Sequence, residues 1–174
     1  SLHDALPIYK MQREWLDRLP FDIYSVNVHT GAKRLIGRSY RTAPKWSVNG
    51  KWAVMYDPIA QVWNKFDGAT GKVVNISDAI GYPMFMESYD KPAPAPAYGI
   101  AGWTADGNNV FLYDAYDWWK IDLTGERQPE CLTKGYGRKH GKSIRKMTSN
   151  IDKDVFQKDE KVIVSLWDKD TMDE

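Results

Sequence analysis

The sequence predicts an all-β fold, and its aromatic content, its turn residues and an internal repeat support this prediction. Of the 174 residues, 13% are aromatic, with eight Trp, ten Tyr and five Phe. Aromatic residues are enriched in β-strands. The 13 Gly and nine Pro are spread along the chain, which is typical of short strands separated by turns. Apolar residues make up 43%, enough to bury a core.

Charge and residue usage exclude several classes of function. The 24 Lys and Arg residues balance 23 Asp and Glu, and the net charge of +1 indicates no surface for nucleic acid or for an anionic membrane. No apolar run approaches the 18 residues that would indicate a membrane span. Cys131 is the single cysteine, which excludes an intrachain disulfide and a multi-cysteine zinc site. We therefore expect no metal and no cofactor.

Two segments of the chain repeat at a spacing of 57 residues, 44–57 and 101–114. The matching positions are Trp46 with Trp103, Gly50 with Gly107, Tyr56 with Tyr113 and Asp57 with Asp114. A weaker third copy, 158–168, ends in another pair of an aromatic residue and an aspartate, Trp167-Asp168. Repeats of this length indicate one structural unit used several times.

Each copy predicts a hairpin followed by a buried strand. Asn49-Gly50 and Asp106-Gly107 are strong signals for a type I′ turn. The runs that follow, 52–56, 110–113 and 162–167, are apolar on both faces, which predicts strands covered on both sides. Each run ends in an aspartate, a poor strand former that suits a turn.

A second repeated element consists of a strand, a polar turn closed by Thr-Gly, and another strand. Its three copies lie at 22–36, 61–77 and 118–133. Strand periodicity places alternate residues on one face. The residues that we expect on one face are Trp119, Ile121 and Leu123 in one copy and Tyr24, Val26 and Val28 in another.

A complete unit therefore holds four short strands in about 55 residues, which is the pattern of a β-propeller blade. A β-sandwich would not repeat these marks in the same order, and a parallel α/β fold would need long helical crossovers. We expect a partial propeller of about three antiparallel blades. Residues 1–8 fit no pattern and are taken as an artefact of cloning or sequencing. The expected units are 9–43 (a partial blade), 44–97 (a blade and a Pro-Ala linker), 98–147 (a blade) and 148–174 (the start of the next).

The segment before Pro20 is ambiguous. Met11, Trp15 and Leu19 have helical spacing, and Pro20 would end such a helix. The repeat register instead places the second strand of a blade at Tyr9–Arg13. We favour the strand, followed by a loop to Phe21.

Two short motifs resemble catalytic or phosphate-binding signatures but are incomplete. Gly141-Lys142-Ser143 resembles the end of a phosphate-binding loop, but Tyr136 stands where that loop needs glycine. We expect a turn there. The segment Gly37–Arg41 lacks the second glycine of the Gly-x-Ser-x-Gly nucleophile elbow.

The segment Lys134–Lys146 is basic throughout and contains no acid. It could bind an anion, a substrate carboxylate or an acidic partner, although a solvated loop beside the acidic region 152–174 is the simpler interpretation. Only Tyr136 interleaves with the basic residues, whereas nucleic-acid binding would need several aromatic residues there. The basic residues are Lys134, Arg138, Lys139, Lys142, Arg145 and Lys146.

The remaining candidates have simpler structural explanations. Paired carboxylates could hydrolyse glycosides, but the recurrence of Asp57, Asp114 and Asp168 favours a turn role. Stacked tryptophans could bind sugars, but packing between blades is the simpler role. Pro92–Ala97 is a stiff, extended stretch that we expect to link two blades. The tryptophans considered are Trp46, Trp103, Trp118 and Trp119; Cys131 and the histidines His3, His29 and His140 have no partners that would make a site.

The repeat residues resemble a known family. Trp46–Lys51 and Trp103–Gly107 are similar to the Trp-Ser-Pro-Asp-Gly-Lys core of the TolB-type, WD40-like propeller repeat of prolyl oligopeptidase family serine peptidases. Val48 and Ala105 replace the usual proline. The segments Trp119–Gly125 and Leu132–Arg138 resemble the bacterial dipeptidyl-peptidase and acylaminoacyl-peptidase subgroup most. The resemblance covers residues 9–174.

The resemblance implies a role in controlling access to an active site. In that family a propeller precedes an α/β-hydrolase domain with a Ser-Asp-His triad, and no triad residue lies in this segment. The chain would then be a non-catalytic fragment that guides peptide substrates to a hydrolase partner domain, in a periplasmic or secreted protein. The alternatives are a TolB-like scaffold for protein–protein interaction and, less favoured, a propeller glycoside hydrolase.

Overall fold

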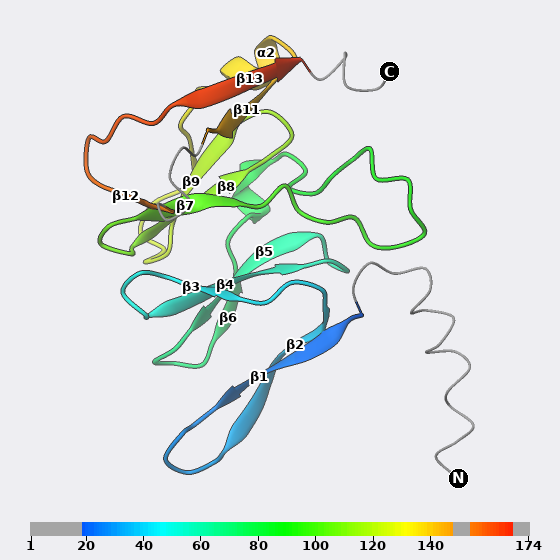
Figure 1. Ribbon diagram of the computed structural model, residues 1–174. Helices are drawn as coiled ribbons and strands as arrows, with labels where there is room; N and C mark the ends of the chain where they lie inside the picture. Colours follow the sequence, from blue (N-terminus) through cyan, green and yellow to red (C-terminus); the bar gives the residue numbers. More distant parts are fainter. Residues whose placement is uncertain (1–18, 148–153, 169–174) are drawn as a thin grey trace.

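The computed structural model describes residues 19–147 and 154–168, and these form a mostly β structure of four sheets stacked in chain order (Figure 1). All strand pairs are antiparallel except one. The all-β, antiparallel part of the predicted fold is therefore confirmed. The strand predicted at Tyr9–Arg13 lies outside the described residues.

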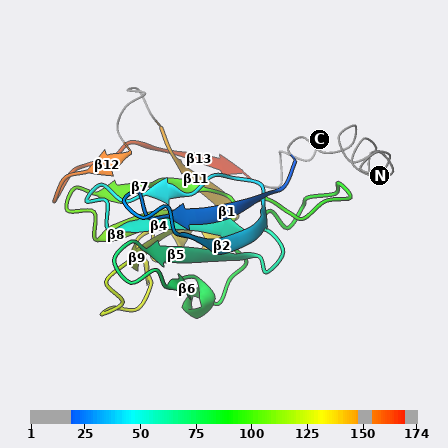
Figure 2. The same ribbon diagram turned by 90° about the horizontal axis from the view of Figure 1, so that it is seen from below.

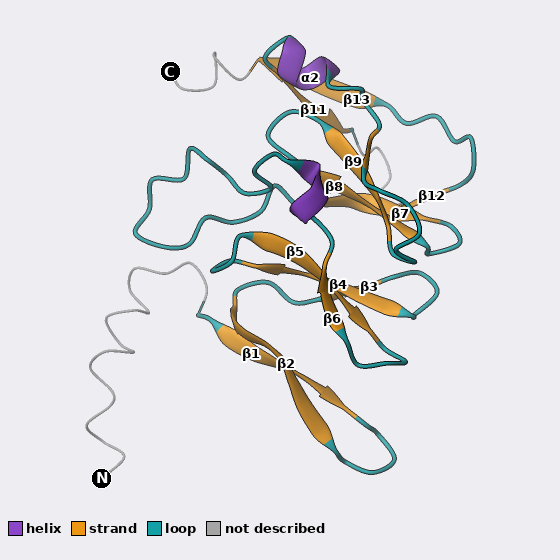
Figure 3. Ribbon diagram, turned by 180° about the vertical axis from the view of Figure 1, so that it is seen from behind, coloured by secondary structure: helices purple, strands orange, loops and turns teal. Residues whose placement is uncertain are grey.

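The strands are short and follow the predicted turns. The first sheet pairs β1 (Phe21–Val26) with β2 (Lys33–Tyr40); the second is β3 (Lys45–Trp46), β4 (Trp52–Asp57), β5 (Val62–Asp67) and β6 (Val73–Asn75). The third contains β7 (Ile100–Thr104), β8 (Asn109–Tyr113), β9 (Trp118–Asp122), β10 (Glu130–Cys131) and β12 (Val155–Phe156); the fourth pairs β11 (Lys142–Lys146) with β13 (Val164–Asp168). Two short helices, η1 (Asp78–Ile80) and α2 (Tyr136–Lys139), lie in the connections (Figure 3).

The two central sheets share one topology. Strands β3 to β6 and strands β7 to β10 each follow one another as antiparallel neighbours. Both also pair a tyrosine of the second strand with a tryptophan of the third, Tyr56 with Trp63 and Tyr113 with Trp118, although the second connection is two residues shorter. The 57-residue spacing in the sequence thus corresponds to a repeated hairpin geometry. The sequence did not predict β12, which adds a parallel edge strand beside β7 through Val155 and Trp103.

The hairpins form at the predicted places, but the predicted type I′ turn is wrong. A type I′ turn needs positive φ at both central residues. Gly50 and Gly107 have φ of 68° and 70°, whereas Asn49 and Asp106 are not among the described residues with positive φ. Each loop is two residues longer than the two-residue loop of a type I′ hairpin. In the first loop the Gly50 N–H donates to Ser47 O and closes a four-residue turn, and Gly50, the last residue of that turn, has the left-handed conformation.

Polar side chains close the second type of turn. Asn27 Oδ1 accepts hydrogen bonds from His29 N and Thr30 N, and Asp67 Oδ1 accepts them from Ala69 N and Thr70 N. Side chains of this kind mimic a backbone turn. The predicted strand–turn–strand elements are confirmed in β1–β2, β5–β6 and β9–β10.

The core lies in three apolar layers between the four sheets. The first layer joins Ile23 and Tyr40 to Met55 and Phe66. The second and largest lies between the central sheets, and the third joins the third sheet to Ile144. The view from below shows the sheets one behind another (Figure 2). The prediction that strands 52–56 and 110–113 are covered on both sides is confirmed, because these residues are buried.

The same prediction is wrong for 162–167. Trp167 is 56% exposed and Leu166 is also exposed, because no sheet covers the outer face of the fourth sheet within the described residues. In β1 the buried residue is Ile23, whereas Tyr24 and Val26 are exposed. In the third sheet, Ile121 and Leu123, which were expected to share one face, are both buried.

The hairpin loops of the two central sheets contact one another. Asn49 Nδ2 donates to Asp106 O at 2.9 Å and to Asn108 Oδ1 at 3.2 Å. Asn49 therefore forms part of the turn in its own repeat unit, and its side chain also connects that turn to the corresponding turn of the next unit.

This contact makes Gly107 less replaceable than its repeat partner. A Cβ on Gly107 would lie 2.6 Å from Asn49 N, whereas a Cβ on Gly50 would meet nothing within 4 Å. Both glycines have positive φ, so Gly50→Ala should cost about 1 kcal/mol of unfolding free energy. Gly107→Ala should cost about 2 kcal/mol more, because the loops must move apart. Urea denaturation of both variants tests this; equal losses would contradict it.

Candidate functional site

A pocket of about 420 Å³ lies where the connection 89–100 passes β4 and β5. Its walls are largely apolar and come from Val54, Tyr56 and Trp63 on the second sheet and from Pro94 and Pro96 on the connection. The Pro-Ala stretch runs antiparallel to the segment around Phe85, and Phe85 forms an isolated β-bridge with Ala97. The stretch predicted as a linker thus belongs to the connection between the second and third sheets and also forms one wall of this pocket.

Tyr56 ties that wall to the sheet. Its hydroxyl donates to Ala95 O at 3.1 Å, and its ring packs on Trp63 with centroids 5.5 Å apart. Burial, with the neighbouring Asp57 charge, raises the pKa of Tyr56 well above its usual value. The hydrogen bond from Tyr56 therefore joins the Pro-Ala wall of the pocket to β4.

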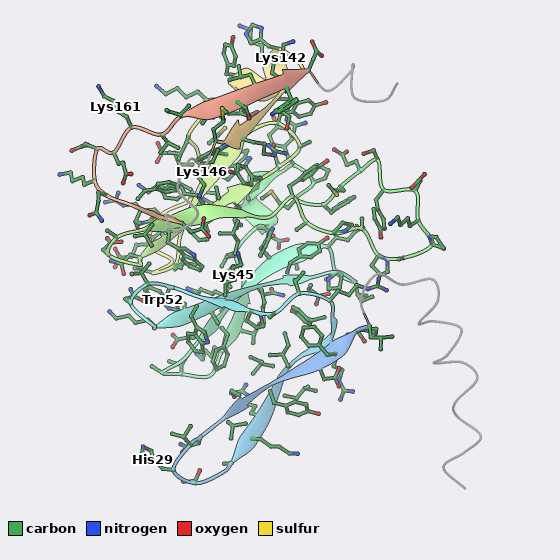
Figure 4. The ribbon with its side chains drawn as sticks, viewed as in Figure 1. His29, Lys45, Trp52, Lys142, Lys146 and Lys161 are labelled. Carbon is green, nitrogen blue, oxygen red and sulfur yellow. The ribbon has the colours of Figure 1, made fainter. Side chains whose placement is uncertain are left out.

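The charges at the pocket have one sign. Arg41 and Lys45 line it, and no acidic residue does. Lys45 projects beside the second sheet in the side-chain view (Figure 4). Apolar walls with two cations in the lining suit a small ligand that carries an apolar group and a carboxylate. The described lining contains no serine, cysteine or histidine, and its apolar walls and two cations are features of a binding site.

The basic segment is largely engaged within the molecule, so the prediction of a solvated loop there is wrong. It forms α2 and β11, and the turn predicted at Gly141–Ser143 is limited to Gly141, since Lys142 begins β11. Lys142 pairs with Asp168 and Lys146 with Asp154. Arg138 pairs with Asp114 at 3.0 Å, and its guanidinium lies 3.9 Å from the Tyr82 ring centroid.

Arg145 stabilises the turn between β8 and β9. It donates to Asp114 O at 2.9 Å and stacks on Tyr113 at 4.7 Å. Burial lowers the pKa of Arg145, and nearby tyrosines and aspartates oppose that shift. Within the described residues, these contacts leave fewer cations for a soluble anion than the sequence suggested.

Two buried aspartates organise the same region. Asp114 Oδ1 accepts hydrogen bonds from Tyr116 N and Asp117 N, and its Oδ2 accepts one from Trp119 Nε1. Asp117 accepts hydrogen bonds from Thr133 Oγ1 and from the Gly137 and Arg138 amides. The sequence did not predict the role of Asp117 or of the two arginines. The only sequence signal for this buried cluster is the pair of aspartates that flank Ala115 and Tyr116.

The structure does not gather the three recurring aspartates into a site. Asp57, Asp114 and Asp168 belong to three different sheets. Asp57 Oδ1 accepts hydrogen bonds from Ile59 N and Ala60 N, so the predicted turn role is confirmed at Asp57 and Asp114. Asp168 is the last residue of β13, as Asp57 is of β4, and it pairs with Lys142; the residues that would form a turn after it lie outside the described part of the chain.

The remaining candidates take structural positions. Trp103 and Trp118 are buried and Trp119 is half-buried, as expected for packing residues, whereas Trp46 is 54% exposed. Cys131 Sγ accepts a hydrogen bond from Gly135 N, and the His140 ring lies 4.3 Å from that of Tyr136. His29 sits at the tip of the first hairpin (Figure 4), and His3 lies outside the described residues. Residues 37–41 end β2, with Ser39 N bonded to Asp22.

The comparisons with known proteins add no relative. No family model, no curated protein and no solved structure matches this chain. Among the described residues, no cluster of potential metal ligands is present, and none of the helices there has the length and apolar character needed to cross a membrane. The function must therefore be inferred from the repeat and from the pocket.

Proposed function

We propose that this chain is a non-catalytic β-propeller segment of a prolyl oligopeptidase-like serine peptidase, which limits and guides the access of peptides to a hydrolase domain. The observation that carries the proposal is the pair of central sheets, which repeat one four-strand meander at a 57-residue spacing and pack face to face. Stacked four-stranded antiparallel units are the architecture of propeller blades. The resemblance of the repeat residues to that peptidase family supports the rest.

The pocket supports a peptide ligand. Pro94, Pro96 and Trp63 would pack against an apolar side chain, while Arg41 and Lys45 would attract a terminal carboxylate. Within the described residues, the lining contains no serine, cysteine or histidine, which are the residues that most often supply the nucleophile and the base for peptide hydrolysis. The proposal therefore places the chemistry in the partner domain and only peptide selection in this chain.

A binding experiment tests the peptide part of the proposal. Calorimetric titration of the chain with short proline-containing peptides should show binding, and C-terminal amidation of the same peptides should weaken it. Lys45→Ala should weaken binding as amidation does. Lys51→Ala is the matched control, because Lys51 lies over Trp52 and does not line the pocket. Equal binding of acid and amide peptides would contradict the role of the two cations.

A labelling experiment tests the peptidase part. The 174-residue chain should not react with a fluorophosphonate probe, whereas a longer product of the same gene should react at a Gly-x-Ser-x-Gly serine. Absence of that motif from the gene would overturn the peptidase assignment. It would favour a TolB-like scaffold for protein partners, which the exposed apolar residues of β1 and β13 also suit.

A further inference from the structure

The loop between β3 and β4 contains an asparagine that is followed by glycine. Asn49 is the only asparagine of the chain that precedes glycine, and both Asn49 and Gly50 are exposed to water. Glycine has no side chain, so nothing on it shields its backbone nitrogen from the asparagine amide carbon. The loop belongs to the complete four-stranded second sheet. Asparagine at such a position can cyclise and lose its amide without an enzyme.

The reaction joins Gly50 N to Asn49 Cγ. The Gly50 amide loses its proton to water, its nitrogen attacks Cγ, and the Asn49 NH₂ group takes up a proton and leaves as ammonia. The product is a succinimide ring, which water opens at either of its two carbonyls. One opening gives aspartate, and the other gives isoaspartate, whose backbone runs through the former side-chain carbon. The only co-reactant is water.

The folded loop holds both reacting groups in hydrogen bonds. The Gly50 N–H donates to Ser47 O at 2.9 Å, which protects the proton that must be lost. Asn49 Oδ1 accepts a hydrogen bond from Ser47 Oγ at 2.8 Å. Asn49 Nδ2, the leaving group, donates to Asp106 O and Asn108 Oδ1 in the loop of the third sheet. Loss of the proton and of ammonia therefore requires that these hydrogen bonds break first.

We propose that Asn49 is a deamidation site controlled by the contact between the hairpin loops of the second and third sheets, and that the reaction in turn breaks this contact. While the loops touch, the hydrogen bonds keep the asparagine intact. Each local opening lets some chains react, and the loss of ammonia makes the change irreversible. Chains without the link between the two repeat units therefore accumulate with time. The inference does not depend on the proposed peptidase function.

The aspartate product should keep the turn and lose the link between the repeat units. Asp106 matches Asn49 in the next unit, and it accepts hydrogen bonds from Thr104 Oγ1 and Asn108 N within its own loop. An aspartate at position 49 can accept equivalent bonds, but its carboxylate has no proton to donate to Asp106 O or Asn108 Oδ1. Asn108 could present its amide nitrogen only by giving up its own hydrogen bond to Asp106 Oδ2.

The isoaspartate product should disrupt the turn as well. It places an extra carbon atom in the backbone between residue 49 and Gly50. The turn is closed by the Gly50 N–H on Ser47 O, and Gly50 has a φ of 68°. The extra atom displaces Gly50 from that acceptor and from Trp52, the buried first residue of β4. We therefore expect isoaspartate to destabilise the β3–β4 hairpin more than aspartate does.

Mass spectrometry of tryptic peptides, after incubation of the full chain at mildly alkaline pH, tests the site. In the chain unfolded with urea, Asn49 should deamidate, whereas Asn27 should remain intact because the branched side chain of Val28 hinders the attack. In the folded chain Asn49 should react about tenfold more slowly, since the reaction waits for local opening. Equal rates in the folded and unfolded chains would overturn the control by the fold. Absence of reaction at Asn49 in both would overturn the site.

Gly107→Ala tests whether the loop contact controls the reaction. A Cβ on Gly107 would lie 2.6 Å from Asn49 N, so this change forces the loops apart and leaves the reacting residues in place. Deamidation in the folded variant should be at least about threefold faster than in the wild type. Gly125→Ala is the matched control, because Gly125 also has positive φ and the nearest atom to its Cβ would be Lys65 Nζ at 3.9 Å. Equal rates in the two variants, both folded by circular dichroism, would overturn the role of the contact.

Asn49→Asp reproduces the aspartate product and tests its effect on the fold. It should lower the midpoint of urea denaturation, because the hydrogen bonds to Asp106 O and Asn108 Oδ1 are lost. In an Asn108→Ala background the same change should lower the midpoint less, since one of the two acceptors is already absent. An unchanged midpoint for Asn49→Asp, or an equal loss in both backgrounds, would overturn the conclusion that deamidation breaks the loop contact.

Discussion

Asp114→Asn should destabilise the chain by about 3 kcal/mol, because it leaves the Arg138 guanidinium without its buried anion. Asp114 is 0% exposed, and its carboxylate holds Arg138, Trp119 Nε1 and two turn amides. The asparagine oxygen can still accept from the amides, but its NH₂ group would face two donors. The midpoint of urea denaturation at pH 7 measures the loss.

The matched control is Asp57→Asn at the equivalent repeat position. Asp57 accepts hydrogen bonds from Ile59 N and Ala60 N, and no ion pair is recorded for it among the described residues. Asparagine serves as well as aspartate in such a turn, so the change should be within about 0.5 kcal/mol. If both variants lost the same stability, the turn hydrogen bonds alone would account for the effect and the buried pair would not.

The features predictable from the sequence are those with local causes. The runs 52–56 and 110–113 are apolar on both faces, and their strands lie between two sheets. Asn27 and Asp67 close turns with their own side chains, which a short segment specifies completely. The 57-residue spacing predicted a repeated unit, and β4–β5 and β8–β9 both pair a tyrosine with a tryptophan.

The features that could not be predicted depend on residues far apart in the chain. The run 162–167 has the same apolar pattern as β4, but its strand is exposed because burial depends on which sheet covers it. The basic segment 134–146 looks solvated in sequence, yet Arg138 meets Asp114 from 24 residues away. The pocket forms only when the Pro-Ala stretch comes to lie beside β4 and β5. Composition gives no information on any of these contacts.

Leu112→Ala should produce the largest loss of stability, about 4 kcal/mol. Leu112 is 0% exposed and lies in the apolar layer that joins the two central sheets, with Val54 and Trp63 on the facing sheet. Its neighbours in β7 and β9, Ile100 and Trp119, are fixed by strand pairing and cannot collapse into the space. Truncation therefore removes buried apolar surface and leaves a cavity between two sheets.

The exposed Leu132 provides the matched control, since Leu132→Ala removes the same atoms from the surface and should cost less than about 1 kcal/mol. Both variants are compared by urea denaturation and by the slope of unfolding free energy against urea. Because Leu112 bridges the central sheets, its truncation should lower the midpoint without changing the slope if they unfold as one unit. A reduced slope, or two transitions, would show instead that the sheets unfold separately and that the layer between them adds little cooperativity.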